Sequence, residues 1–154
     1  METLTPVETP KKPTVSPQDG SHAAIIHISA LSNYIGVPFG SILGPLIFWL
    51  IWRDESKFVD ENGKESLNFN LSMLIYQFII IIVGIVIFIS SITGLAVSEG
   101  EDPFLALLAI PGIWLFVGGL GLISLIRLIL VIVAAIKAHS GEVYHYPLSL
   151  RLIK

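Results

Sequence analysis

The sequence predicts an all-α membrane protein, a small transmembrane bundle of three to four helices. Charged residues make up 14% of the chain and hydrophobic residues 53%, whereas soluble domains carry about 25% charged residues. The charges are also clustered. Residues 21–52 and 66–98 contain none, and residues 103–136 contain only Arg127. Because a bilayer core about 30 Å thick needs roughly 20 apolar residues of helix, each of these regions is long enough to form membrane helix.

The length of 154 residues predicts one domain, and the net charge of −3 is small. No basic cluster indicates a nucleic-acid partner. The chain has no cysteine, which excludes disulfides, thiolate metal sites and a cysteine nucleophile. We divide it into a disordered Pro-rich tail over residues 1–20, too polar to offset its chain entropy, and a helical transmembrane domain over residues 21–154.

The first apolar region, about residues 22–52, is too long for one straight membrane helix and too short for two full spans. A Gly- and Pro-containing stretch, residues 36–40, interrupts it near the middle. Two arrangements fit. One is an interfacial helix over about 22–36 followed by a short membrane helix over about 39–52. The other is a tight helical hairpin that enters and leaves on one side.

The second apolar region covers about residues 67–97 and follows a charged loop, residues 53–65. Ser56 in this loop is a suitable N-cap for the helix. At roughly 46 Å, a helix over 67–97 must tilt or stand partly outside the bilayer.

The third apolar region covers about residues 104–136. Pro103 before it suits the first turn of a helix. Pro111-Gly112 predicts a break within it, because the region is again too long for one straight span.

Lysine and arginine predict the orientation. They occur in the loop 53–65 and in the C-terminal segment, and they are absent from residues 98–102. The positive-inside rule therefore predicts a multi-pass protein of the cell membrane, with the loop 53–65 and the C-terminus in the cytoplasm and the loop 98–102 outside. A hairpin in the first apolar region would place the N-terminal segment inside, and a single crossing would place it outside.

Two patterns of small and amide residues predict contacts between helices, because such side chains allow close approach and hydrogen bonding. One pattern recurs every seven residues and so follows one helix face: Asn70, Gln77, Gly84 and Ser91. The other recurs every four residues: Gly36, Gly40 and Gly44. For the first pattern, a polar face that lines a solute path or meets a partner is the functional alternative to packing.

Arg127 is an intramembrane charge, which is costly near the middle of a bilayer. It lies ten residues before Lys137, or about 15 Å deep, and Gln77 lies twelve residues after Glu65, or about 18 Å deep. We therefore hypothesise that Arg127 donates a hydrogen bond to Gln77, with Tyr76 as a second candidate. Alternatively, the membrane span ends at Arg127, which then reaches the interface.

No set of residues predicts catalysis, a metal site or a cofactor site. His139, Glu142 and His145 are three residues apart, but they follow the last helix, where this spacing need not bring them together. Residues 60–63 faintly resemble a calcium loop, although the ligand pattern is wrong, and a solvated turn or helix start fits better. We expect neither enzyme activity nor a bound cofactor.

Several short motifs, in order along the chain, resemble one family. They lie at residues 44–51 and 54–69, and near the C-terminus as Ala135-Ile136-Lys137-Ala138, Gly141-Glu142 and Tyr146-Pro147. Over about residues 22–154 the chain resembles a widespread family of small prokaryotic membrane proteins of unknown function. That family is distantly similar to the twenty-kilodalton subunit of the chloroplast inner-envelope translocon, and so is Tic-like. The resemblance implies three to four membrane helices and no enzyme activity.

Two positions depart from the family pattern. Asn62 stands where members often have His, which argues against a titratable role for this position, and Asn70 stands where members often have Gln, which keeps the amide.

Two functions remain open from the sequence. The first is a non-enzymatic interaction protein, a membrane subunit that packs against itself or a larger membrane complex; a role related to protein translocation is the version that the resemblance suggests. The second is a channel or carrier for a small solute, with Asn70, Gln77 and Arg127 along its path. A conduit usually needs more polar residues than these.

Overall fold

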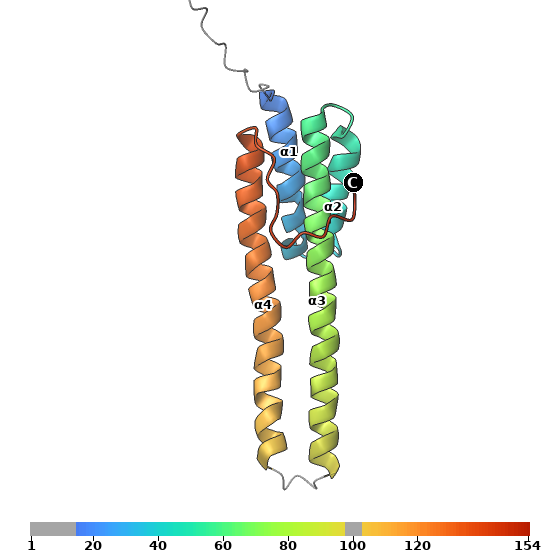
Figure 1. The fold of residues 1–154 in the computed structure, drawn as a ribbon, viewed down its shortest axis with the longest axis vertical. Helices are drawn as coiled ribbons and strands as arrows, with labels where there is room; N and C mark the ends of the chain where they lie inside the picture. The colour runs from blue at the N-terminus through green and yellow to red at the C-terminus, as the bar shows by residue number, and fades with distance from the viewer. Residues whose placement is uncertain (1–14, 98–102) are drawn as a thin grey trace, which may run out of the picture.

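The computed structural model describes residues 15–97 and 103–154, which form helices and contain no strand. In chain order these are α1 (Pro17–Ser29), the 3-10 helix η1 (Ala30–Ile35), α2 (Gly40–Trp52), α3 (Lys57–Val97) and α4 (Pro103–His139). Figure 1 shows α3 and α4 as a long antiparallel pair, with α1 and α2 packed beside only one end of it. We call this end the head (residues 15–76 and 127–154). The predicted all-α class is confirmed for the described residues.

The head begins earlier than the sequence predicts. The side chain of Ser16 caps α1, because its Oγ accepts a hydrogen bond from the N–H of Asp19 at 3.0 Å. Helix therefore starts at Pro17, and the predicted tail over residues 1–20 is too long by its last four residues. Residues 1–14 lie outside the part of the chain that the structure describes.

The first apolar region forms a tight helical hairpin, one of the two arrangements that the sequence allows. The chain turns after η1, where Gly36 has a φ of +89° and Phe39 a φ of +54°. The far ends of α1 and α2 are joined by His22, whose Nδ1 lies 2.6 Å from Glu55 Oε2 and whose ring stacks on Trp52 at 4.0 Å. Both ends of the hairpin therefore lie on the same side of the head.

The starts of the two long helices agree with the sequence analysis. Ser56 caps α3 by accepting a hydrogen bond from the N–H of Val59 at 3.3 Å, and α4 begins at Pro103. The predicted break at Pro111-Gly112 is wrong, because α4 continues to His139. A proline removes one backbone donor from a helix, and the remaining hydrogen bonds of this 37-residue helix keep it continuous.

The hydrophobic core lies in the head, where α1, α3, α4 and the C-terminal segment meet. Its buried members include Phe69, Met73 and Val131. By length and composition, two stretches of helix could cross a membrane, Lys57–Gly94 and Phe116–His139. Only 11% and 22% of their most apolar windows are buried within this chain, so both stretches present large exposed apolar faces.

Candidate functional site

A histidine lies fully buried at the centre of the head. His27 of α1 is 0% exposed; its Nε2 lies 3.0 Å from Asn62 Oδ1, and its Nδ1 lies 2.9 Å from the hydroxyl of Tyr146. The amide nitrogen of Asn62 donates to the carbonyl of Phe58, so the amide oxygen faces the ring. Nε2–H therefore donates to Asn62, and Nδ1 accepts from the Tyr146 hydroxyl. We call His27, Asn62 and Tyr146 the buried histidine cluster.

The cluster is electrically neutral around pH 7. Burial lowers the pKa of His27 from 6.5 to about 4, and the hydrogen bond that the ring donates to Asn62 and the charge of Glu65 only partly oppose this effect. Burial also raises the pKa of Tyr146 well above its usual value. The hydrogen bonds of these groups tie α1, α3 and the C-terminal segment together.

The sequence analysis missed this cluster. It placed residues 60–63 in a solvated turn or a helix start; they lie in the first turns of α3, but Asn62 and Gly63 are buried. A side chain added at Gly63 would meet the indole of Trp49, which explains the glycine. No local pattern links His27 to Asn62, which is 35 residues away, and only the packing of α1 on α3 brings them together.

The C-terminal segment, residues 140–154, returns along α3 without helix or strand pairing. Its backbone is hydrogen-bonded instead by three polar side chains on one face of α3, which we call the ladder: Asn68, Ser72 and Tyr76. Asn68 makes most of these hydrogen bonds. Its Nδ2 donates to the carbonyl of Ile153 at 2.9 Å, and its Oδ1 accepts from the N–H groups of Leu152 and Ile153 at 3.0 and 2.7 Å.

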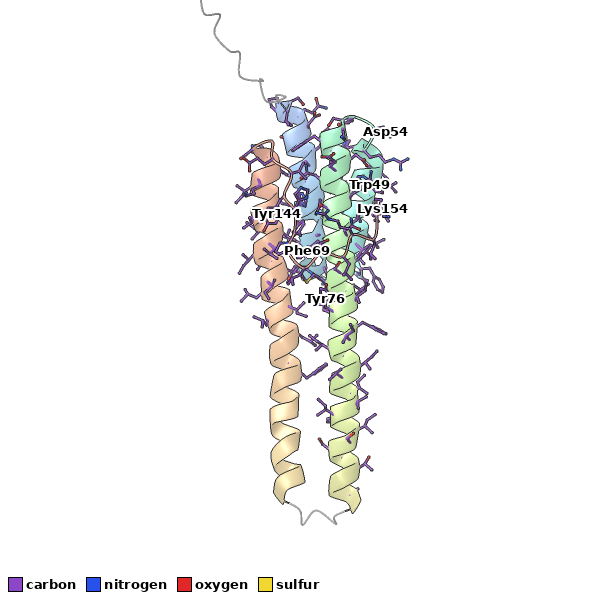
Figure 2. The ribbon with its side chains drawn as sticks, viewed as in Figure 1. Trp49, Asp54, Phe69, Tyr76, Tyr144 and Lys154 are labelled. Atoms are coloured by element: carbon purple, nitrogen blue, oxygen red, sulfur yellow. The ribbon has the colours of Figure 1, made fainter. Side chains whose placement is uncertain are left out.

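The other two ladder residues hold the segment one and two helical turns further along. Ser72 Oγ accepts from the N–H of Leu150 at 2.7 Å, and the Tyr76 hydroxyl donates to the carbonyl of Leu148 at 2.9 Å. Tyr146 then stacks on Phe69 with ring centroids 4.0 Å apart. Figure 2 shows Phe69 and Tyr76 following each other along α3, on the stretch that the segment covers.

The hydrogen bond hypothesised for Arg127 is present. Nη2 of Arg127 donates to Gln77 Oε1 at 3.1 Å, and the arginine is 3% exposed. Its Nε is buried and has no partner among the described residues. Tyr76, the second candidate, is not a partner, because its hydroxyl donates to the carbonyl of Leu148.

The residues that recur every seven positions on α3 lie against protein. Gln77 meets α4 through Arg127, and a side chain added at Gly84 would meet the ring of Phe116 on α4. Asn70 is 0% and Ser91 7% exposed. This arrangement is typical of helix packing.

Two of the three glycines in the first apolar region allow α2 to approach the preceding helices, Gly40 at η1 and Gly44 at the end of α1. A side chain at Gly40 would collide with Ser32, and one at Gly44 would collide with the carbonyl of Ser29. Gly36 does not belong to this contact, because no atom would lie within 4 Å of its added Cβ. Its positive φ permits the turn instead.

The C-terminal histidines and their neighbours take separate partners. His145 Nδ1 lies 2.9 Å from Glu65, and Glu142 lies 3.6 Å from Lys137. Within the described ranges there is no group of three His, Cys, Asp or Glu side chains placed to hold a metal ion.

These features define a small all-helical protein with a long, outwardly apolar helical hairpin and a head held together by buried polar contacts. The chain belongs to the MamF/MmsF family, the magnetosome magnetite crystal formation protein family, which it matches over residues 18–153. The match covers nearly all of the part that resembles a small prokaryotic family, and it gives no support to a relation with the chloroplast translocon. Neither a curated protein nor a solved structure matches the chain.

Proposed function

We propose that this protein is an integral, non-enzymatic protein of the magnetosome membrane that contributes to magnetite crystal formation by packing with other membrane components. The exposed apolar faces of α3 and α4 carry the membrane part of the proposal. Membership of the magnetosome magnetite crystal formation family supports the magnetosome membrane as the location and crystal formation as the process.

The length of α3 supports a complete crossing. From Lys64, the last lysine before the apolar region, to Val97 the helix rises about 50 Å. A bilayer with its headgroup layers is about 40–45 Å thick, so a tilt of about 30° fits the helix to it. The exposed aliphatic side chains of α2 then face lipid, and the α1–α2 hairpin enters and leaves on one side.

We also propose an orientation. The α2–α3 turn at residues 53–56 and the end of α4 at His139 lie at the head, whereas Val97 and Pro103 lie at the opposite end of the long helices (Figure 1). Because the lysines and arginines gather at the head, we place it on the cytoplasmic side.

The contacts of Arg127 favour an interaction protein over a channel or carrier. Its guanidinium and the amide of Gln77 bond to each other between α3 and α4, so these polar groups are used within one chain. A solute path would have to break this pair and leave a buried charge without its acceptor, which is costly.

The test uses a magnetosome-forming cell that encodes this chain, with an affinity tag at the N-terminus. We expect the protein to remain in purified magnetosome membranes after an alkaline carbonate wash and to co-purify with a discrete membrane partner, and we expect its deletion to change crystal size or number. Release by carbonate would contradict the membrane placement. Normal crystals after deletion, with no partner retained, would contradict the role.

The absence of native cysteine allows the orientation to be tested separately. Single cysteines at Ser16 and Ser140, which lie at the head end of α1 and α4, should both react with an impermeant maleimide added to purified, sealed magnetosomes, because their outer face is the cytoplasmic one. Labelling of either one only after the vesicles are permeabilised would reverse the proposed orientation.

A further inference from the structure

A charged pocket of about 200 Å³ lies between the first turns of α3 and the end of the C-terminal segment. Three cations line it, Lys64, Arg151 and Lys154, together with two carboxylates, Glu61 and Glu65. The volume is below that of a typical drug-sized site and suits a small headgroup fragment.

The charges of the pocket leave two cations available. Lys64 lies 2.6 Å from Asp60, and Glu65 lies 2.9 Å from His145, which also lines the pocket. Among the ion pairs of the described residues, none includes Arg151 or Lys154, and both side chains are exposed. Arg151 and Lys154 are therefore the two cations of the lining that a bound anion could pair with.

The level of the pocket in the molecule is that of a membrane–water interface. Figure 2 shows Lys154 between the levels of Asp54 and Phe69, close to that of Trp49. The indole N–H of Trp49 donates to Asp60 at 2.9 Å, and the guanidinium of Arg53 lies over its ring. A tryptophan with such polar neighbours beside apolar surface is typical of the headgroup layer.

The C-terminal segment also carries an apolar ridge, whose residues alternate in sequence with the pocket residues Arg151 and Ile153. Three leucines of the C-terminal segment alternate in sequence and are exposed by 62%, 41% and 55%: Leu148, Leu150 and Leu152. The ladder from Asn68 to Tyr76 fixes the ridge along α3 over about 12 Å, and the ridge leads away from the charged end. Because side chains alternate along an extended segment, the leucines face away from Arg151 and Ile153, so the ridge adds exposed apolar surface near the pocket without continuing it.

We propose that this pocket binds the phosphodiester of a membrane phospholipid. Arg151 and Lys154 hold the phosphate, and the acyl chains lie in the surrounding bilayer. A guanidinium pairs with phosphate through two parallel hydrogen bonds, and the phosphodiester of a phospholipid carries one negative charge that Arg151 and Lys154 can share. The proposal rests on the membrane placement made above, and it adds a specific lipid site on the cytoplasmic leaflet.

The test measures lipid binding to the full chain in detergent by native mass spectrometry. The probes are dioleoyl phosphatidylglycerol, dioleoylglycerol and inorganic phosphate, each added alone and in competition. We expect one phosphatidylglycerol per chain, with about tenfold weaker binding of dioleoylglycerol, which lacks the phosphate. Arg151→Gln with Lys154→Gln should weaken phosphatidylglycerol binding by about tenfold or more.

The matched control is Arg53→Gln with Lys137→Gln, which removes one arginine and one lysine of the head that do not line the pocket. It should bind the lipid as the unmodified chain does. Equal loss in the control and pocket variants, no loss in either, or equal binding of dioleoylglycerol would overturn the proposal. So would displacement of the lipid by equimolar inorganic phosphate, because the site would then be a phosphate site. If the double variant unfolds, Arg151→Gln alone decides.

Membrane placement is scored by carbonate extraction and lipid binding is scored in detergent, so either proposal can fail without the other. Suppose that the chain resists carbonate, but the unmodified protein and the Arg151→Gln variant bind the lipid equally well. The membrane placement would then stand, and the lipid site would be ruled out.

Discussion

Acidification should destabilise this protein through His27, because protonation of its imidazole places a charge inside the head. Nδ1 accepts a hydrogen bond from Tyr146, and Nε2 already donates to Asn62. A protonated ring would turn the accepting nitrogen into a second donor that faces a hydroxyl donor. The perturbation is therefore a change of pH, and the variant that removes it is His27→Gln.

The magnitude follows from the two pKa values. The pKa of His27 is 6.5 as the reference value and about 4 in the folded chain. Between these values the unfolded chain binds a proton that the folded chain excludes, so the free energy of unfolding falls as the pH falls. The whole difference corresponds to about 3 kcal/mol, of which about 2 kcal/mol is lost between pH 7 and pH 5. Above pH 6.5 the contribution is fully present.

The assay is equilibrium unfolding in detergent at pH 7 and pH 5. The quantity compared is the change in the free energy of unfolding between the two pH values, and not its absolute size. His27→Gln should remove about 2 kcal/mol of the pH dependence, although it also lowers stability at pH 7. His139→Gln makes the same chemical change at an exposed position and should keep the slope. If the unmodified chain and His27→Gln lose stability equally between pH 7 and pH 5, the reasoning about this cluster is wrong.

Three substitutions test the other polar and close contacts. Gln77→Leu should lower the free energy of unfolding in detergent by about 2–4 kcal/mol, because the buried Arg127 loses its acceptor. If the double variant Gln77→Leu with Arg127→Leu loses the sum of the two single losses, the pair is not coupled. Gly44→Leu should separate α1 from α2 and lower the melting temperature strongly. Gly118→Leu is the control and should be tolerated, because its added Cβ would meet nothing within 4 Å. Equal falls in melting temperature would contradict the close contact at Gly44. Ser72→Ala should leave the N–H of Leu150 without its acceptor. The free energy of unfolding should fall by about 1–3 kcal/mol, and proteolysis of the C-terminal segment should become faster. An unchanged rate of cleavage would show that the ladder does not hold the segment.

The sequence predicts the local features of the fold well because they depend on neighbouring residues. The stretch 36–40 separates two helices, Ser56 caps α3, and Pro103 begins α4. For Arg127 and Gln77, the number of residues between each side chain and the charged end of its helix also predicts that the two meet at the same depth. Both lie on continuous helices with a fixed rise per residue.

The errors arise where a local signal has several outcomes. Pro111-Gly112 can end a helix, but a long helix also continues through a proline. Gly36 matches the spacing of the helix contact, but its place before the turn gives it a conformational role. The C-terminal segment has no helical periodicity, and its position depends on bonds to side chains more than 70 residues away, such as Ser72 to Leu150.

The ladder also changes how the polar residues of α3 should be interpreted. In a helix that crosses a bilayer, Asn68, Ser72 and Tyr76 would ordinarily suggest a path for a polar solute. Here each of them bonds to the backbone of the C-terminal segment, whose N–H and C=O groups have no helix or strand partners. An irregular segment at membrane depth is stable only when its backbone groups are satisfied within the protein. The polarity of Asn68, Ser72 and Tyr76 is therefore explained by the segment that they bind, and these three residues do not by themselves indicate a solute path.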